Sequence, residues 1–485
     1  MNRSRIFTGL ILLAVLIAQV LTHLGWLSIS AHSGEVALPW MMNQGRVMFG
    51  NVLEQHAPGT TVIVALALRL FAAVDPVLVT RMLNLLLVLA LTLLIFTLAR
   101  RLAGNRAGLL AVLIWFWWEP VYGNILFYFD SVVGLLIMLA LVCWLLLSAR
   151  KPGWLAPLAA GFLLGGATLA KQHAWATVVL FGLWLWLYQR DQLIIYIVAA
   201  LILPLAAVIG VAFQGDLPAY LYWNWQYNLS GYMPNSLPTG DLVRKLVLSN
   251  LFLPPFLLLA LRRRNRFWLL IGMVWLGALA DLLPRFNDIH AMAHLPLACV
   301  IGGVILTELL PDPLSLAELR QKLPQIGVAE LTLAGIMLMI LAGWLWTGAA
   351  VYFAAPVGRA GIPAYDEFKP LAAALKTMSK PGDTLFVLPE TDSTPQIHPL
   401  SGLLAPGTWV KGWFWYFDAP GIVPMLLNEW DQTPPTYIVY FPDLISVGQP
   451  GIQPLVDFMN AHYQSVETIS PIPLEGDAVI YRYKR

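Results

Sequence analysis

The chain has 485 residues, of which 59% are hydrophobic and only 12% are charged, and its formal net charge is +2. A soluble domain carries about twice this charged fraction, so the composition excludes a soluble globule as well as a disordered chain. The near-neutral net charge leaves no broad basic face for a nucleic acid. Cys143 and Cys299 lie inside apolar runs without metal-ligand spacing, which indicates core packing. A polytopic membrane protein built from helices remains.

The first apolar run follows Arg3 and Arg5, and no small-residue cleavage site closes it. We therefore expect a retained first span with the N-terminus in the cytoplasm. Further runs recur between polar turns, of which the basic turn at 262–266 is the strongest positive-inside signal. The predicted spans are residues 7–29, 59–74, 77–99, 107–123, 125–147, 155–170, 174–188, 193–213, 246–261, 267–283, 295–310 and 328–352.

The region between residues 59 and 148 poses a parity problem. It contains four apolar runs, whereas the basic turn at residue 150 lies on the cytoplasmic side only after an odd number of crossings. One run is therefore expected to be a half-helix or an interfacial segment. From residue 150 onward the loop charges agree with alternating sides. The sequence predicts an all-α polytopic membrane protein with 11–13 transmembrane helices.

The composition changes near Ala354, after which the chain is richer in Pro, Asp, Lys and Gly. Strand-like runs lie at 384–388, 437–441 and 478–483, and helix-like patterns lie at about 364–379 and 452–464. We expect a transmembrane domain over residues 1–353, with its first external loop at 30–58. Residues 354–485 are expected to form a small extracytoplasmic α/β domain. The chain has no GxxxxGK[ST] phosphate loop, which argues against ATP-driven transport by this chain alone.

The first external loop concentrates polar residues with catalytic potential. It carries His32 and Glu35 near its start and Glu54 and His56 near its end, among Trp and Met residues. Such a loop is expected to lie along the membrane interface as short amphipathic helices. A carboxylate held there is partly desolvated and has a raised pKa, which suits a general base. The alternative is that Glu35 and Glu54 are wetted interfacial residues without a catalytic role.

Further polar residues stand at the ends of later spans. A charge at such a position is costly unless it lines a cavity or reaches the interface. Glu119 and Asp130 are candidate acids, whereas Lys171 and Arg285 can stabilise an anionic leaving group in a low-dielectric site. Snorkelling to the interface is the alternative for Lys171. His290 lies four residues before another histidine, but no HExxH pattern surrounds the pair, so no metal site is predicted.

Two aromatic clusters lie outside the predicted spans. The cluster at 220–232 has the composition of an interfacial belt, although aromatic rings also stack on sugars. The cluster at 409–416 lies in the C-terminal part. We expect it either to rest on the membrane or to cover an active site.

The order of these elements resembles that of the GT-C glycosyltransferases. A first span is followed by residues 32–35 (His-Ser-Gly-Glu), by a helix that ends in Gly45, and by residues 54–58 (Glu-Gln-His-Ala-Pro) at the start of the second span. The similarity is to the bacterial branch related to protein O-mannosyltransferases and lipid A aminoarabinose transferases (glycosyltransferase family 39 and its relatives). It covers the arrangement of spans and the external C-terminal domain.

The resemblance implies an enzyme of the cell membrane that moves a sugar from a polyprenyl-phosphate carrier to an acceptor hydroxyl on the extracytoplasmic face. In the family an acid of the first loop acts on the acceptor. This chain has His32 where the family commonly has Asp, so Glu35 is the predicted base, with His32 as its partner or competitor. The alternative is that the family acid is absent and the chain is inactive or uses different chemistry.

The resemblance also implies roles for the remaining candidates. Cations and histidines before later spans would contact the lipid phosphate, which fits Lys171, Arg285 and His290. Glu54 and His56 would face the donor or a metal, and a second external loop would supply a further acid. No cofactor is certain, and the pattern leaves room for a divalent cation.

Two other functions fit parts of the sequence. A transporter or flippase would have an internal repeat and polar residues near the bilayer midplane, whereas the polar residues here gather on one side and no repeat is present. An envelope scaffold protein would leave Glu35, Lys171 and Arg285 unexplained as a set. The expected partners are the lipid bilayer, a lipid-linked sugar donor and a glycan, lipid or protein acceptor, and no nucleic acid.

Overall fold

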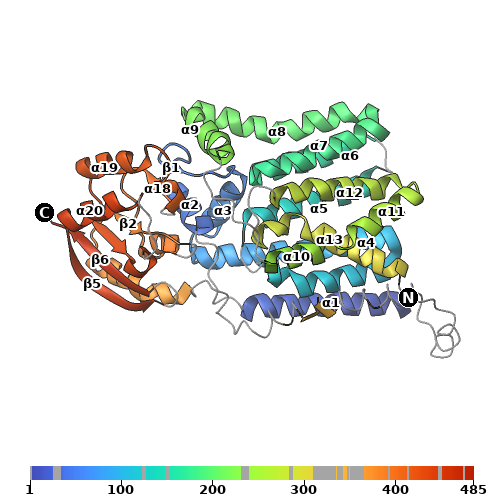
Figure 1. Ribbon diagram of the computed structural model, residues 1–485, viewed down its shortest axis with the longest axis horizontal. Coiled ribbons are helices and arrows are strands. Elements are labelled where there is room, and N and C mark those ends of the chain that lie inside the picture. Colours follow the sequence, from blue (N-terminus) through green and yellow to red (C-terminus); the bar gives the residue numbers. More distant parts are fainter. Residues whose placement is uncertain are drawn as a thin grey trace.

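Two structural parts lie end to end along the long axis of the molecule (Figure 1). A bundle of helices forms one part, and a sheet with flanking helices forms the other, with the two chain termini at opposite ends. The computed structural model describes residues 3–25, 34–122, 127–148, 153–230, 240–282, 288–309, 365–391, 394–411, 414–445, 451–472 and 476–484, together with isolated positions between 335 and 349.

The helices of the bundle coincide with the predicted apolar runs. Four described helices are long and apolar enough to cross a bilayer, and shorter apolar helices accompany them. The bundle contains α1 (Arg3–Gly25), α3 (Gly59–Leu70), α4 (Pro76–Trp118), α5 (Phe129–Leu147), α6 (Leu155–Ala170), α7 (Trp175–Tyr188), α8 (Arg190–Gln214), α10 (Gly240–Asn250), α11 (Leu253–Arg262), α12 (Arg266–Leu279) and α13 (Leu295–Leu309). The last predicted span, 328–352, falls almost entirely outside the described residues, so the count of 11–13 spans stays a prediction.

Helix α4 is a hairpin of two antiparallel arms, so it corresponds to two of the four predicted runs. Its backbone leaves helical geometry at Ala103 and Gly104, where the glycine φ of 87° is a left-handed value. Trp115 Nε1 donates a hydrogen bond to Thr92 Oγ1 at 3.0 Å, although a straight helix would separate these residues by about 35 Å. Helix α3, with 12 residues, is only about 18 Å long and is the expected half-helix. With α3 as the half-helix, the two arms of α4 and helix α5 would give the odd number of crossings within the described part of 59–148, and this count stays a prediction.

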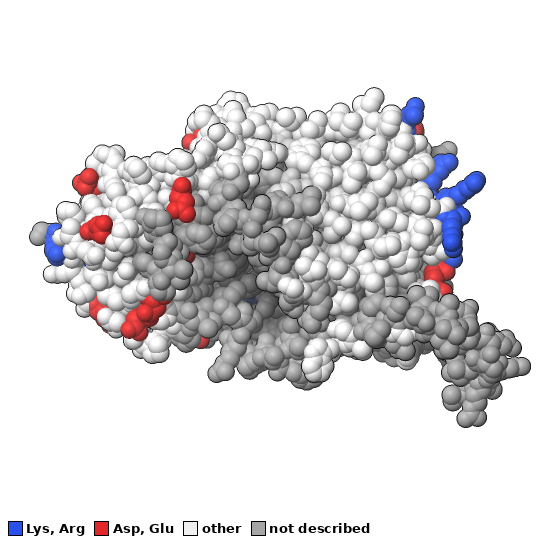
Figure 2. Space-filling model, in the orientation of Figure 1, with Lys and Arg blue, Asp and Glu red and all other residues white. Residues whose placement is uncertain are grey.

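Lysine and arginine side chains gather at the end of the bundle farthest from the C-terminal part (Figure 2). The turn between α11 and α12 belongs to this end. There Arg263 forms an ion pair with Glu308 at 2.6 Å, and the Arg266 guanidinium lies 5.4 Å from the centroid of the Tyr188 ring. The described surface along the bundle carries almost no charged side chains in this view. This is the distribution that the positive-inside rule expects when the basic end is cytoplasmic.

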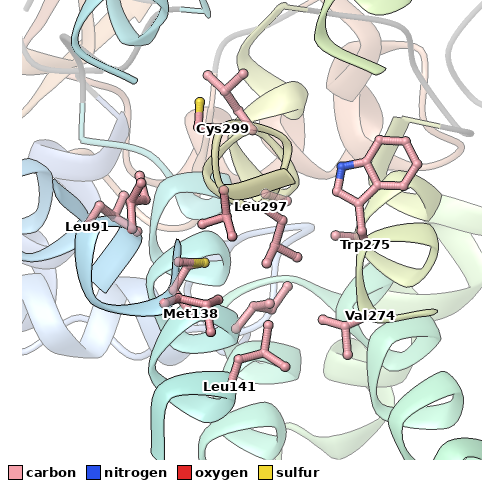
Figure 3. Close-up of a cluster of buried hydrophobic side chains, with 14 of the residues drawn as sticks. Leu91, Met138, Leu141, Val274, Trp275, Leu297 and Cys299 are labelled. Carbon is pink, nitrogen blue, oxygen red and sulfur yellow. The ribbon is translucent and has the colours of Figure 1, made fainter. Parts of the chain in front are cut away.

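Apolar side chains from α4, α5, α12 and α13 fill the centre of the bundle (Figure 3). Leu91, Met138 and Cys299 lie in this core, and each is almost completely buried. Helices α6 and α8 are in close contact at Gly161 and Gly165. A β-carbon at either position would collide with carbonyl oxygens of α8. Small residues allow such close helix packing in membranes.

The C-terminal part is built on a four-stranded sheet in the order β2-β4-β6-β5. Strands β2 (Leu385–Leu388) and β4 (Tyr437–Tyr440) are parallel, whereas β6 (Gly476–Tyr483) is antiparallel to β4 and to β5 (Tyr463–Ile472). The three predicted strands are therefore confirmed. Strand β5 escaped prediction because most of its side chains are exposed at the edge of the sheet and carry no alternating apolar pattern.

Helices cover both faces of this sheet. Leu385 and Val387 of β2 pack with α16 (Lys369–Met378), whereas Phe386 and Leu388 pack with α19 (Ile422–Gln432) and α20 (Gln453–His462). The alternation follows from the two-residue period of a strand. Two of these helices, α16 and α20, coincide with the predicted helix-like patterns. The part is a three-layer α/β unit, and its placement outside the cytoplasm stays a prediction.

The first loop connects the two parts. Helix α2 (Gly34–Asn43) packs against α3 and α4 on one side and against residues 394–401 of the C-terminal part on the other. Strand β1 (Val52–Leu53) pairs in parallel with β3 (Trp409–Val410), and Arg46 donates hydrogen bonds to the carbonyl oxygens of Ala405 and Gly407. Helix α2 is therefore packed between the two parts, and its position at the membrane interface stays a prediction. Residues 34–39 and Met41 of α2 are buried. The C-terminal part covers one side of this helix through residues 394–401.

Candidate functional site

Glu54, His56 and Lys411 form a buried cluster where the two parts meet. Glu54 follows β1 and Lys411 follows β3, so the parallel register of these strands sets the two residues side by side. Glu54 Oε1 lies 2.5 Å from His56 Nδ1 and also accepts the His56 backbone N–H at 3.0 Å. Glu54 Oε2 lies 3.7 Å from the Lys411 ammonium nitrogen. Glu54 is 0% exposed and Lys411 only 1%, so this ion pair is desolvated.

Asp130, Lys171 and His290 form a second buried cluster. Asp130 lies in the first turn of α5, Lys171 follows α6, and His290 belongs to the 3₁₀ helix η5 (Asp288–Ala293). Lys171 Nζ donates to Asp130 Oδ1 at 2.6 Å and lies 2.8 Å from His290 Nδ1. His290 Nδ1 is in turn 3.2 Å from Asp130 Oδ2. The fold thus joins three of the predicted site residues, which lie far apart in the sequence.

The two clusters are neighbours. The ring of His56 stacks on Phe129, which precedes Asp130, with 4.1 Å between the ring centroids and 20° between the planes. Gln172, which follows Lys171, donates from Nε2 to the backbone carbonyl of Gln55 at 2.9 Å. Glu54 therefore contacts Lys411, whereas Gln55 and His56 contact residues that are adjacent in sequence to the second cluster.

Two glycines permit this convergence. A β-carbon at Gly59 would lie 2.6 Å from the carbonyl oxygen of Leu169, near the end of α6. A β-carbon at Gly134, one turn after Asp130, would lie 2.7 Å from the carbonyl oxygen of Met292 in η5. Real β-carbons do not approach other atoms so closely. Because neither glycine has a side chain, the end of the first loop can approach α6, and η5 can approach α5.

Glu35 is buried close to the first cluster without a hydrogen bond of its own. It lies in the first turn of α2 and is 0% exposed, and neither carboxylate oxygen has a hydrogen-bond partner among the described residues. Burial raises the pKa of Glu35 to about 8, against the opposing charge of Lys411 and with a further rise from Glu54. Glu35 is therefore mostly protonated at neutral pH, and its ionised form is a strong proton acceptor.

Glu54 has the opposite protonation state. Burial by itself would raise its pKa, but the charge of Lys411 and the hydrogen bonds from His56 outweigh burial and lower the pKa to about 2. Burial lowers the pKa of His56, although Glu54 opposes this, so the imidazole is mainly neutral. The Lys411 ammonium is thus the charge that keeps Glu54 ionised. One of the two first-loop carboxylates is charged and the other is neutral.

The remaining predicted residues have other positions. Glu119 lies in the 3₁₀ helix η1 (Glu119–Tyr122), where its Oε2 accepts a hydrogen bond from Gln19 at 3.0 Å and its Oε1 lies 3.2 Å from His23 Nε2. Both partners belong to α1, so these hydrogen bonds tie Glu119 to the first helix. His32 and Arg285 lie outside the described residues.

The aromatic cluster at 220–232 is not simply an interfacial belt. Trp223 and Tyr227 are buried and pack against Tyr416 of α18 (Phe414–Phe417), with ring centroids 5.5 Å and 6.0 Å away. Tyr416 Oη accepts the backbone N–H of Gln55 at 3.3 Å. The belt interpretation is therefore wrong for these two residues, and Tyr416 contacts the loop segment that carries Glu54 and His56.

Sequence reasoning missed Lys411 and the amide side chains around the loop. Asn224 Oδ1 accepts from Gln172 Nε2 at 2.9 Å, and Asn228 Nδ2 donates to the Gln55 carbonyl at 2.8 Å. The only signal for Lys411 was a charged residue directly after a short apolar strand within an aromatic segment. Among the described residues, no three His, Cys, Asp or Glu side chains gather closely enough to hold a metal ion.

The comparisons with known proteins bear on the fold. No protein-family model matches the chain, and no curated protein matches it in sequence. The structure of ArnT from Cupriavidus metallidurans bound to undecaprenyl phosphate is similar, with a TM-score of 0.63 at 15% identity over 98% of this chain and 97% of that chain.

Two archaeal structures are also similar. The Archaeoglobus fulgidus oligosaccharyltransferase tethered with an acceptor peptide has a TM-score of 0.58 at 11% identity, over 98% of this chain and 74% of that one. AglB from Archaeoglobus fulgidus, in complex with an inhibitory peptide and a dolichol-phosphate, has a TM-score of 0.54 at 11% identity, over 96% and 74% of the two chains. This chain therefore has the GT-C fold of membrane glycosyltransferases, to which an aminoarabinose transferase and an oligosaccharyltransferase belong.

Proposed function

We propose that this chain is a membrane glycosyltransferase that moves a sugar from a polyprenyl-phosphate donor to an acceptor hydroxyl. The observation that carries the proposal is the meeting of two buried clusters, each with a carboxylate paired to a lysine, at the junction of the bundle and the C-terminal part. Structures of the same fold hold undecaprenyl phosphate or a dolichol-phosphate, which supports a lipid-linked donor. No observation on the described residues favours the transporter alternative.

The second cluster has the chemistry to bind the phosphate. When the bond between the anomeric carbon and the phosphate oxygen breaks, the electron pair stays on the phosphate, which leaves with an additional negative charge. Lys171 and His290 are buried, where their attraction for an anion is less weakened by water. Asp130 holds both side chains in position by hydrogen bonds. Arg285 and the protonated form of His56, with Nε2 as the donor, are the further phosphate ligands in this proposal.

Glu35 is the proposed base. The acceptor oxygen forms a bond to the anomeric carbon and transfers its proton to the Glu35 carboxylate. With a pKa of about 8, roughly a tenth of Glu35 is ionised at pH 7, but this fraction is more basic than an ordinary carboxylate. Glu54 stays ionised and accepts the His56 N–H, which orients the imidazole. His32 is the proposed partner of Glu35.

The charge distribution also gives a proposal for the topology. The basic end of the bundle would face the cytoplasm together with the N-terminus. The two clusters and the C-terminal domain, residues 354–485, would then face the extracytoplasmic side of the cell membrane. The transmembrane domain, residues 1–353, would bind the lipid-linked donor on this side.

The purified chain in lipid nanodiscs, supplied with a polyprenyl-phosphate sugar and candidate hydroxyl acceptors, tests the proposal. We expect donor-dependent transfer, and we expect Glu35→Gln to lower the rate by at least about 10²-fold, since this is the usual contribution of a general base. Binding of polyprenyl phosphate to the variant should stay unchanged. Glu467→Gln on the exposed edge strand β5 is the matched control. Full transfer by Glu35→Gln would reject Glu35 as the base.

A further inference from the structure

Lys411 of the C-terminal part acts electrostatically on both first-loop carboxylates. It lies at the end of β3, and its ammonium is 3.7 Å from Glu54 Oε2. The same ammonium acts on the charge of Glu35, although Glu35 lies on a different element, the helix α2. A lysine that is 1% exposed is rare unless its charge has a partner, because desolvation of an ammonium is costly.

The backbone fixes this position of Lys411. Strands β1 and β3 pair in parallel, with Val52 opposite Trp409 and Leu53 opposite Val410. Continuing the register by one residue places Glu54 beside Lys411. The hydrogen bond from the backbone N–H of Trp409 to the carbonyl of Asn51, at 2.9 Å, holds the pairing at its start. The ion pair is therefore set by main-chain geometry and does not depend on a flexible side chain alone.

The charge states of Glu35, Glu54 and Lys411 depend on one another. Glu35 and Glu54 together could carry two negative charges, but one ammonium faces them. Glu54 Oε2 has no hydrogen bond among the described residues, so the attraction of Lys411 is the main compensation for its charge. Without that ammonium, two buried carboxylates would share a low-dielectric site, where like charges repel strongly.

We propose that Lys411 is a positioning residue of the transferase site: it holds one negative charge on the Glu35–Glu54 pair and leaves the second carboxyl free to take a proton. The C-terminal part is then a portion of the site and not an appendage. This inference rests on the proposed function for its catalytic meaning, whereas the charge coupling between Lys411 and the pair can be measured without a substrate.

Other titratable groups surround the set and belong in the interpretation of any pH effect. His56 bonds Glu54, and Lys171 lies near enough to lower the pKa of His56. The side chains of Asp130 and His290 contact Lys171. On the C-terminal side, Glu390 and His398 border Trp409, which precedes Lys411 by two residues: Trp409 Nε1 donates to Glu390 at 3.4 Å, and His398 lies 3.6 Å from the same oxygen.

The first test needs no donor. The thermal midpoint of the full chain in nanodiscs is measured between pH 5 and pH 9 for the unaltered protein, Lys411→Met, Glu54→Gln and the double variant. Lys411→Met removes the ammonium, so the two carboxyls hold protons to higher pH in the folded chain than in the unfolded one. We therefore expect its midpoint to be lower and to fall more steeply as the pH rises. The double variant should recover most of the loss.

Additive effects of Lys411→Met and Glu54→Gln would overturn the inference, as would a Lys411→Met profile that matches the unaltered chain. Lys376→Met, at an exposed lysine of α16, controls for the loss of a lysine in the same part of the protein. The double variant also covers the case in which Lys411→Met alone does not fold.

The second test uses transfer. We expect Lys411→Met to lower the rate at pH 7 by about 10²-fold and to move the rising limb of the pH–rate profile upward by about one unit, since removing a buried charge has effects of this size. Lys411→Arg keeps the charge, so the rising limb of its pH–rate profile should stay at the same pH. An unshifted limb in Lys411→Met would contradict the positioning role. Absence of transfer in the unaltered chain would overturn the proposed function and leave the thermal coupling to decide on Lys411.

Discussion

Glu119 and Asp130 occupy similar places in the sequence, on either side of one loop and at the ends of two apolar runs. Both are completely buried. Their partners differ, because Glu119 bonds Gln19 and His23 of the first helix, whereas Asp130 bonds the ammonium of Lys171 and lies beside His290. Two acids that look alike in sequence thus enter different networks.

The difference shows what makes a buried acid a candidate for chemistry. Glu119 joins one helix end to another, a role that an uncharged hydrogen-bonding residue could share. Asp130 holds a buried cation next to the first-loop cluster, with the His56 ring stacked on its neighbour Phe129. A buried ion pair is a costly way to stabilise a fold, so its presence at the junction is better explained by ligand binding. The predictions below test this contrast.

Lys171→Met is expected to give the largest loss. It removes the cation that we propose stabilises the departing phosphate, and we expect the transfer rate to fall by about 10³-fold, the upper end for loss of one such group. It also leaves Asp130 buried without its ion pair, which destabilises the fold. The rate per folded protein is therefore measured together with the thermal midpoint.

The double variant Lys171→Met/Asp130→Asn separates the two effects. With the charges of both partners removed, we expect the thermal midpoint to return close to that of the unaltered chain, while transfer stays lost. Recovery of transfer in the double variant would mean that Lys171 serves only to neutralise Asp130, and that the phosphate binds elsewhere.

The pH dependence of transfer reports on Glu35. Because the base acts in its ionised form, the rate should rise about tenfold between pH 6 and pH 7 and level off above pH 8, in line with a pKa of about 8. The stability of the folded chain changes with pH in the opposite direction. The folded-state pKa lies above the ordinary value of 4.5, so the thermal midpoint should fall as the pH rises from 4.5 to 8, and Glu35→Gln should remove this fall. A rate that is flat between pH 6 and pH 8 would argue against Glu35.

Gly134→Ala is expected to have a moderate effect. The added β-carbon would meet the carbonyl oxygen of Met292 and push η5, with His290, away from Asp130 and Lys171. We expect about a tenfold loss of transfer, since small displacements of positioned groups are costly. Gly210→Ala in α8 is the matched control, because a β-carbon there meets nothing within 4 Å. Equal activity of the two variants would show that η5 does not need its present position.

Much of the fold could be predicted from the sequence, because hydropathy and charge act locally. The apolar runs predicted the helices, and the short apolar stretches at 384–388 and 437–441 predicted the two parallel strands β2 and β4. The break between the predicted runs 77–99 and 107–123 also predicted the reversal, which the structure places at Ala103 and Gly104. Strand β5 was missed because most of its side chains are exposed and carry no apolar pattern.

The candidate site was predictable in part for a different reason. Glu54, Asp130, Lys171 and His290 attract notice because charges next to apolar spans need an explanation, and the fold brings them to one junction. Lys411 could not be found in this way, since it lies outside the apolar spans, in a C-terminal part where a lysine is ordinary. Only the pairing of β1 with β3 places it at Glu54, and strand pairing across more than half of the chain is not encoded in any local pattern.

Glu119→Gln is expected to have the smallest effect on transfer and a measurable effect on stability. The change keeps the size of the side chain but weakens the hydrogen bonds to Gln19 and His23, which costs about 1–2 kcal/mol for bonds to a charged group. The thermal midpoint should therefore fall by a few degrees, while the rate per folded protein stays within about twofold of the unaltered value. A loss of transfer as large as that of Lys171→Met, with an unchanged midpoint, would place Glu119 in the site. The two acids would then share one network, and the distinction drawn from their partners would fail.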